Sequence, residues 1–375
     1  MRSQEISSFL QRQIDASDFP SAVYLVAEKG EIRYQDALGY AVVEPERIEA
    51  TLDTVYDLAS LTKPLVTGLL AAIMVERGEI DPNDPVGNLL PEFYVSGNAE
   101  ITIDQLLMHT SGLPAWRPFY LLVETADLVA EEIARTLQVA DQPPVTYSDL
   151  NFLTLAFVLE RLAGKDLAEL AADEVISQLG LADTCFNPLT RFPKKQIAAS
   201  EKGNEYEKGT CIELGFLLPE LAATSGHFRD YQIWGEVHDG NAWFMGGATG
   251  HAGLFSTVKD VFTIAQQFLA EHTTVLKPET CDLFRTNFTK GMNEDRSFAF
   301  QLASTPGATA GTKMSPESFG HNGFTGTSLW IDPINERIFV LLTNRTHAHP
   351  LPFVNINSVR RRFHDIAVDL LDSNS

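Results

Sequence analysis

The first eighty positions carry the patterns of four elements in succession. Apolar residues at intervals of four predict one amphipathic helix. Two runs rich in β-branched and aromatic residues follow, and the Lys29-Gly30 pair between them is typical of a hairpin turn. A nearly uncharged segment then predicts a buried helix that ends at Gly78. These elements are expected near residues 6–14, 22–27, 32–40 and 64–77.

The pattern changes between residues 81 and 290. Short segments with helical periodicity alternate there with loops rich in Pro, Gly and Asp, which indicates a mostly helical lobe. The expected helices cover 102–108, 128–139, 150–163 and 261–270.

Strand patterns return near the end of the chain, at 297–303, 326–331 and 337–343. A final helix is indicated by apolar residues at helical spacing between Val359 and Leu370. The run Arg360-Arg361-Arg362 within it is interpreted as a solvated helix face.

Strands and a helix thus occur at both ends of the chain, with a helical block between them. The simplest fold class is α+β: one antiparallel sheet built from residues 1–80 and 291–375 and flanked by the terminal helices. Residues 81–290 form the inserted helical domain. The cleft between the two parts is the expected ligand site.

Composition narrows the function classes. Among 375 residues the formal net charge is −22, and such an acidic surface repels phosphate backbones, which argues against nucleic-acid binding. No apolar run of membrane-spanning length and no N-terminal signal pattern are visible. We therefore expect a cytoplasmic protein, or a periplasmic one if a signal has been removed. The odd set of three cysteines lacks metal spacing, which predicts reduced thiols.

Ser60-Leu61-Thr62-Lys63 opens the expected buried helix. Positions i and i+3 of a helix share a face, so the two polar side chains can meet. A lysine whose pKa is lowered by burial could take the serine proton and make the hydroxyl nucleophilic. A serine that caps the helix is the structural alternative. A second Ser-x-x-Lys, at 256–259, overlaps a capping pattern formed by Thr257 and Asp260.

Two further elements can supply partners. Tyr147 lies on a loop before an expected helix and could carry a proton to a leaving group, although an interface tyrosine followed by a Ser148 or Asp149 cap is the alternative. His321-Asn322-Gly323-Phe324 precedes an expected strand, where glycines permit close approach of a substrate. The backbone N–H groups of Ser60 and Phe324 could then form an oxyanion hole. A glycine-rich turn with a solvated histidine is the alternative.

The order of these elements resembles that in the serine β-lactamase and penicillin-binding-protein superfamily, especially its class C-like branch of β-lactamases, D-Ala-D-Ala carboxypeptidases and esterases. That family carries Ser-x-x-Lys, Tyr-x-Asn and Lys-Thr-Gly in this order. Phrases at 107–114, 250–257 and 326–333 are also similar, and the resemblance covers roughly residues 15–370. It implies a β-lactamase/transpeptidase-like fold, with Ser60 as nucleophile, Lys63 as base and Tyr147 in proton transfer.

Two positions depart from the family pattern. Asp149 stands where the family often has Asn, and a carboxylate cannot donate an amide hydrogen bond. His321 stands where the β-lactamases have Lys, and a histidine is mostly neutral at pH 7 unless a neighbour such as Asp149 raises its pKa. Both changes weaken the expectation of an efficient β-lactamase.

The leading hypothesis is a two-step acyl transfer through a Ser60 acyl-enzyme on a small-molecule or peptide ester or amide. Lys63, Tyr147 and His321 are the other catalytic candidates, and Asp149, Gly323 and Phe324 are candidates for substrate binding. A true β-lactamase and a non-catalytic module of the same fold remain the alternatives. No cofactor is predicted, and the oligomeric state is open.

One stretch of the chain contains residue types that can bind a metal. Three histidines with two aspartates occur between residues 227 and 251, but none shows His-x-x-x-His spacing. A structured loop is therefore favoured over a metal centre. The residues concerned are His227, Asp230, His238, Asp239 and His251.

Overall fold

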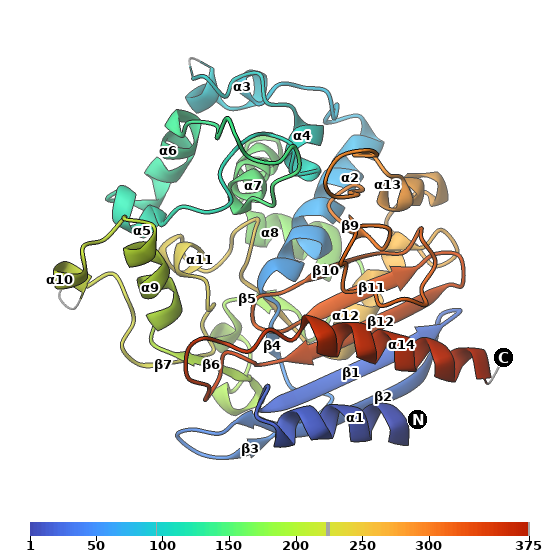
Figure 1. The fold of residues 1–375 in the computed structure, drawn as a ribbon. Coiled ribbons are helices and arrows are strands. Elements are labelled where there is room, and N and C mark those ends of the chain that lie inside the picture. The colour runs from blue at the N-terminus through green and yellow to red at the C-terminus, as the bar shows by residue number, and fades with distance from the viewer. Residues whose placement is uncertain (95, 223–225, 374–375) are drawn as a thin grey trace.

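The computed structural model describes residues 1–94, 96–222 and 226–373. Its centre is a seven-stranded antiparallel sheet in the order β3-β2-β1-β12-β11-β10-β9, built from both ends of the chain (Figure 1). This confirms the expected α+β class. The strands are β1 (Ser21–Glu28), β2 (Glu31–Val42), β3 (Ile48–Glu49), β9 (Gln301–Leu302), β10 (Phe319–Asn322), β11 (Ser328–Asp332) and β12 (Arg337–Thr343).

Both faces of the sheet are covered. Along β1, Tyr24 and its alternate neighbours pack under the terminal helices α1 (Gln4–Asp15) and α14 (Asn357–Ser373). The intervening residues, such as Leu25, belong to the larger core on the other face. Since side chains of a strand point alternately to opposite faces, this fully buried strand serves two cores.

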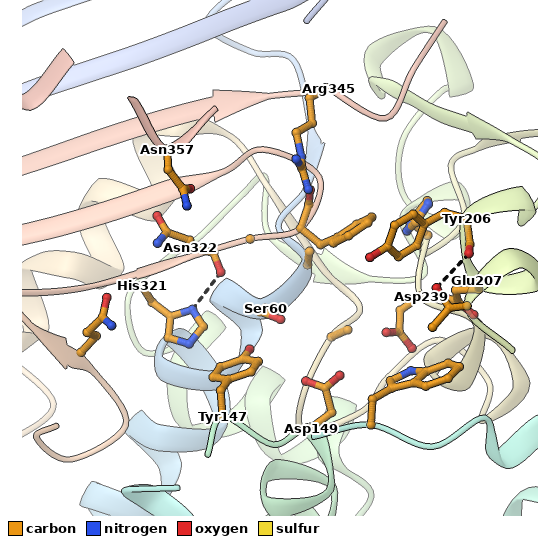
Figure 2. A pocket seen from close by; sticks show the side chains of 18 of the residues that line it. Ser60, Tyr147, Asp149, Tyr206, Glu207, Asp239, His321, Asn322, Arg345 and Asn357 are labelled. Atoms are coloured by element: carbon orange, nitrogen blue, oxygen red, sulfur yellow. Dashed lines mark hydrogen bonds between the residues drawn. The ribbon is translucent and has the colours of Figure 1, made fainter. Parts of the chain in front are cut away.

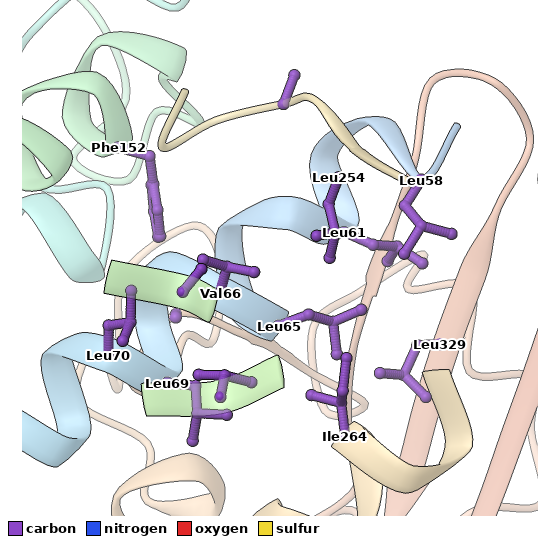
Figure 3. Packing of buried hydrophobic residues seen from close by; sticks show 14 of the residues in the cluster. Leu58, Leu61, Leu65, Val66, Leu69, Leu70, Phe152, Leu254, Ile264 and Leu329 are labelled. Carbon is purple, nitrogen blue, oxygen red and sulfur yellow. The ribbon is translucent and has the colours of Figure 1, made fainter. Parts of the chain in front are cut away.

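The expected buried helix begins at Ala59 and runs through a 3-10 turn and a π-helical segment into α2 (Leu69–Arg77). Gly78, at φ 72°, ends it in the left-handed conformation that glycine adopts without strain. Figure 3 shows its apolar side chains against Phe152, Ile264 and Leu329 of the surrounding elements. The stretch 59–77 is long and apolar enough to cross a membrane, contrary to expectation, but 83% of its apolar 18-residue window is buried inside the protein, as in a core helix.

Helices dominate residues 81–290. The long α7 packs on α4 and α6, whereas α12 packs on β1 and β12 of the main sheet. The expected domain boundaries at 81 and 290 stay a prediction. The helices are α3 (Val86–Leu89), α4 (Ile103–Leu107), α5 (Phe119–Leu122), α6 (Val129–Arg135), α7 (Asp149–Ala163), α8 (Leu167–Ala171), α9 (Glu205–Glu213), α10 (Pro219–Ala222), α11 (Gly240–Phe244), α12 (Val258–Ala265) and α13 (Asp282–Arg285).

Two smaller sheets also occur. One brings the residues before Ser60 beside the chain near residue 254 and so joins this region to the rest, whereas the other lies wholly within residues 81–290. One sheet has the order β4-β8-β5, with β4 (Tyr56–Asp57), β8 (Leu254–Ser256) and β5 (Cys185–Phe186), and the other pairs β6 (Ala199–Lys202) with β7 (Gln232–Trp234).

Several expected boundaries were wrong. The strand expected at 297–303 is reduced to β9, because the backbone turns at Ala299, whose φ is 65°. Helix α6 stops at Arg135 rather than 139, since the Asn98 amide caps its last carbonyls, including that of Ile133 at 3.2 Å. Strand β10 was not expected at all.

Candidate active site

A cavity of 590 Å³ lies where the 59–77 helix begins, facing the start of α7 and strand β10 (Figure 2). The three sequence elements singled out above meet at this cavity. The candidate residues that line it are Ser60, Tyr147, Asp149, His321, Gly323 and Phe324. Their catalytic and binding roles stay predictions that the placement supports.

Ser60 sits on a sharply turned backbone. Ala59 before it has a φ of 47°, a conformation that costs energy for a residue with a side chain. The carboxylate of Asp57 accepts the Ala59 N–H at 2.9 Å, and the hydroxyl of Thr62 donates to the Ala59 carbonyl at 2.7 Å. These bonds hold the turn that presents Ser60 at the head of the helix.

Lys63 lies beneath Ser60 and is fully buried. Its ammonium Nζ is 3.0 Å from the Ser60 Oγ, 3.1 Å from the carbonyl oxygen of His251 and 2.7 Å from Oδ1 of Asp149. Burial alone lowers the pKa of Lys63, but the Asp149 carboxylate and Tyr147 outweigh it, and the net pKa is raised. The expectation that burial makes Lys63 a neutral base at rest was therefore wrong.

Tyr147 completes this group. Its phenol interacts electrostatically with Lys63, and the Lys63 ammonium lies 4.9 Å from the centre of its ring. Burial raises the pKa of the phenol, while the Lys63 charge acts in the opposite direction. Ser60, Lys63 and Tyr147 thus lie together as one group at the cavity, with Lys63 in contact with both of the others.

His321 lies beside Tyr147, with the two ring centres 5.6 Å apart (Figure 2). Its Nδ1 is 3.0 Å from the carbonyl oxygen of Asn322, an acceptor, so Nδ1 carries the proton. Burial lowers its pKa well below the usual range, and the nearby charges of Lys63 and Arg296 lower it further. The suggestion that Asp149 raises this pKa was wrong, because Asp149 pairs with Lys63.

Gly323 and Phe324 form a tightly held turn. A Cβ on Gly323 would lie 2.5 Å from the carbonyl oxygen of Leu58, so glycine allows this turn to approach the segment before Ser60. Arg345 donates to the carbonyl oxygen of Phe324 at 2.7 Å, and Arg360 donates to that of Gly323 at 2.8 Å. Both guanidinium groups therefore fix the backbone whose N–H is the proposed oxyanion donor.

The second Ser-x-x-Lys has a structural use. Ser256 is fully buried and bonds through its hydroxyl to that of Thr184 at 2.7 Å, while Lys259 is exposed. Thr257 caps α12 by accepting the Asp260 N–H, and the Asp260 carboxylate accepts from Asp183 N–H instead of closing a capping box. None of these residues lines the cavity.

The histidine stretch divides between separate partners. His238 pairs with Glu201 at 2.7 Å, and His227 is exposed. His251 pairs with Asp239 at 3.0 Å, and with Asp149 these two offer ligand atoms within 4.8 Å of one another, a geometry that can hold a cation. The Lys63 ammonium already supplies a positive charge there.

Sequence reasoning missed several residues of the cavity wall. Arg360 was interpreted as part of a solvated face, but it is only 5% exposed, because its guanidinium binds two carbonyls of the β10–β11 turn. Its place on the inner face of α14, at helical spacing with Phe363, was the available signal. Other lining residues carried no local signal: Trp116, Tyr206, Glu207, Arg296, Arg345 and Asn357.

The chain is similar to known proteins over most of its length. A family model described as Beta-lactamase matches residues 6–360. A putative D-alanyl-D-alanine carboxypeptidase of Salmonella agona (strain SL483) is 32% identical over 371 residues, covering 92% of this chain and 82% of that protein.

Solved structures share the fold. EstCE1, described as a hydrolase with promiscuous acyltransferase activity, matches with a TM-score of 0.71 at 22% identity and covers 97% of both chains. A class C β-lactamase from Rhodobacter sphaeroides matches with a TM-score of 0.71 at 18% identity, covering 98% of this chain and all of the other (100%). These likenesses confirm the expected β-lactamase/transpeptidase-like architecture.

Proposed function

This chain belongs to the β-lactamase family of serine hydrolases, and we propose that it cleaves an ester or amide of a small molecule or peptide through an acyl-enzyme at Ser60. The observation that carries the proposal is the contact between the Ser60 Oγ and the Lys63 Nζ, 3.0 Å apart at the wall of the cavity. A nucleophile within hydrogen-bond reach of a base is the geometry that acyl transfer requires.

The first step uses the minor, neutral form of Lys63. The Ser60 Oγ attacks the substrate carbonyl carbon while its proton passes to Lys63 Nζ, and the backbone N–H groups of Ser60 and Phe324 stabilise the oxyanion. The tetrahedral intermediate then collapses. The bond from carbon to the leaving oxygen or nitrogen breaks, and Tyr147 passes a proton to that atom from the Lys63 ammonium.

The second step releases the acyl group. Water attacks the Ser60 ester, its proton passes to the Tyr147–Lys63 pair, and the proton returns to the Ser60 Oγ as the ester bond breaks. The products are a carboxylic acid and the free enzyme, so no further reactant is needed.

A peptidase-like or esterase-like substrate fits better than a β-lactam. The relatives are named as putative D-alanyl-D-alanine carboxypeptidases. This chain has His321 at the position where β-lactamases have lysine. The lowered pKa of His321 keeps its side chain neutral. A neutral side chain there gives a substrate carboxylate, whether of a β-lactam or of a D-Ala-D-Ala peptide, no charge to pair with, so this position favours an ester over both.

Labelling with a fluorophosphonate, which phosphonylates a nucleophilic serine, and with a fluorescent penicillin, which acylates it, tests Ser60 as the nucleophile. Mass spectrometry of the labelled protein should place the adduct on Ser60, S60A should abolish it, and S256A should retain it. If neither probe labels the folded protein, the proposal is refuted. A D-Ala-D-Ala peptide, p-nitrophenyl acetate and a chromogenic cephalosporin, compared by kcat/KM, then separate peptidase, esterase and β-lactamase; the cephalosporin should be the poorest.

A further inference from the structure

The loop after α4 holds both neighbours of Tyr147. The Thr146 N–H donates to the carbonyl oxygen of His109 at 2.9 Å, and the Ser148 N–H donates to Nδ1 of the same histidine at 3.0 Å. We propose that His109 is a positioning residue that sets the place of the Tyr147 phenol for acyl transfer. The proposal rests on the function proposed above and adds to it a residue outside the cavity lining.

The same loop continues the pairing beyond Tyr147. The hydroxyl of Ser148 donates to the carbonyl oxygen of Pro114 at 2.7 Å, and the Asp149 N–H donates to that of Ala115 at 2.9 Å. Ser148 stands at the N-cap position of α7, yet its hydroxyl serves this loop rather than the helix. Tyr147 and Asp149 therefore reach the cavity in a register that the loop fixes.

The imidazole also supports Tyr147 directly. The ring centres of His109 and Tyr147 are 4.7 Å apart, at an interplanar angle of 38°. The ring centre of Phe152 lies 5.3 Å from that of His109. His109 is 1% exposed, so its ring has little freedom to move. A displacement of the phenol by about 1 Å is enough to cost about 100-fold in rate.

The hydrogen-bond pattern sets the protonation state of His109. Nδ1 accepts the Ser148 N–H, so the ring proton sits on Nε2 and the imidazole is neutral. Burial lowers the pKa of His109 well below the usual range, and the charges of Arg296 and Lys63 lower it further. The group is thus a fixed acceptor rather than a proton carrier.

Two substitutions separate the acceptor from the ring. His109 has a φ of 59°, and asparagine tolerates this left-handed backbone better than other side chains. In H109N the amide oxygen stands close to where Nδ1 was and can still accept the Ser148 N–H. In H109F an aromatic ring remains against Tyr147, but the acceptor is lost.

The measurement is the second-order rate at which a fluorophosphonate phosphonylates Ser60 with loss of fluoride, expressed per folded protein from circular dichroism and thermal unfolding. The phosphonylation rate of H109F is expected to be about 100-fold lower than that of the wild type, and the rate of H109N within about 5-fold of it. I366A, a core truncation in α14 on the far face of the sheet, should lower the melting temperature without changing this rate.

A double-mutant cycle tests whether His109 acts through Tyr147. In the Y147F background, adding H109F should change the rate by less than about 3-fold. The proposal would be overturned if the fold-losses in rate of the two single variants multiplied in the double variant. A wild-type rate in H109F would overturn it as well. If H109F does not fold, the rate of H109N becomes the test. A rate of H109N as low as that of Y147F would also contradict the proposal. Absence of labelling in the wild type would instead refute the Ser60 chemistry itself.

Discussion

The Nζ atom of Lys63 lies 2.7 Å from Oδ1 of Asp149, inside a site where the same ammonium also contacts the Ser60 hydroxyl. This ion pair stabilises the protonated form of Lys63, the proposed base. Burial alone lowers the pKa of Lys63, and the carboxylate reverses that effect. A lysine must lose its proton before it can accept another, so acylation should become faster as pH rises through the alkaline range.

Asp149→Asn should move this pH dependence to lower pH. Without the Asp149 carboxylate, less remains to oppose the lowering of the Lys63 pKa by burial. The pKa of Lys63 therefore falls, and more of the lysine is neutral at pH 7. On the rising part of the profile, kcat/KM should increase about tenfold for each unit by which the pKa falls. The measurement is kcat/KM for p-nitrophenyl acetate from pH 6 to 10.

An exposed carboxylate provides the matched control for this variant. Asp173 pairs with Lys165 on the surface, away from the cavity, so D173N should leave the profile unchanged. A D149N profile that stays in place, or moves to higher pH, would show that Asp149 does not govern the proton on Lys63.

Lys63→Met should remove the base while keeping an apolar stem of similar length. General-base catalysis contributes about 10²- to 10⁴-fold, and kcat should fall by that amount. K259M is the matched control, because Lys259 has the same spacing from a serine but is exposed and lies outside the cavity lining. Burst kinetics with p-nitrophenyl acetate measure the acylation rate, and equal bursts in both variants would contradict the role of Lys63.

Strand and helix periodicity predicted the elements that bury an apolar face. Strand β12 was expected at its observed bounds because its side chains are apolar and point alternately into the two cores. Phe339, for example, packs in one core and Val340 in the other. Strand β10 was missed because its residues, which include Gly320 and His321, are poor strand formers. Its pairing depends on tertiary context: a Cβ on Gly320 would lie 2.3 Å from Trp330 of the neighbouring strand.

The site divides in the same way. Ser60 and Lys63 could be paired from sequence because their contact is local to one helical turn. The contact between Lys63 and Asp149 could not, since it depends on how α7 docks against the buried helix. The expectation that Asp149 would charge His321 failed for this reason, and the burial of Arg360 was missed because its carbonyl partners belong to a distant turn.

Gly323→Ala should damage catalysis through the backbone. The new Cβ would lie 1.9 Å from the Thr327 Oγ1 and 2.5 Å from the Leu58 carbonyl oxygen, so the turn must move away from Ser60. Displacing one oxyanion donor costs about 100- to 1,000-fold in kcat, and a loss in that range is expected in steady-state assays with p-nitrophenyl acetate.

Gly209→Ala is the corresponding control. Gly209 lies within α9, with open space where a Cβ would be, so alanine should be tolerated and should stabilise the helix by about 1 kcal/mol. Wild-type kcat in G323A would mean that the Phe324 N–H does not serve the oxyanion.

His364 should make the protein lose stability in mild acid. It is fully buried on α14, and burial lowers its pKa to about 3, although its Nδ1 bonds to the Thr309 carbonyl oxygen at 2.7 Å. The unfolded chain has a histidine pKa of about 6.5. As pH falls below that value, the unfolded state gains a proton that the folded state does not, so the contribution of this residue is full above pH 6.5 and declines below it.

His364→Asn isolates this contribution. The asparagine amide can donate to Thr309 but does not titrate, so the stability gap between wild type and H364N should shift in favour of the variant by about 2 kcal/mol between pH 7 and pH 5. Urea unfolding at the two pH values measures the gap. H227N, at an exposed histidine, should show the same gap at both. A gap for H364N that does not change with pH would mean that His364 takes up its proton as readily in the folded protein as in the unfolded chain.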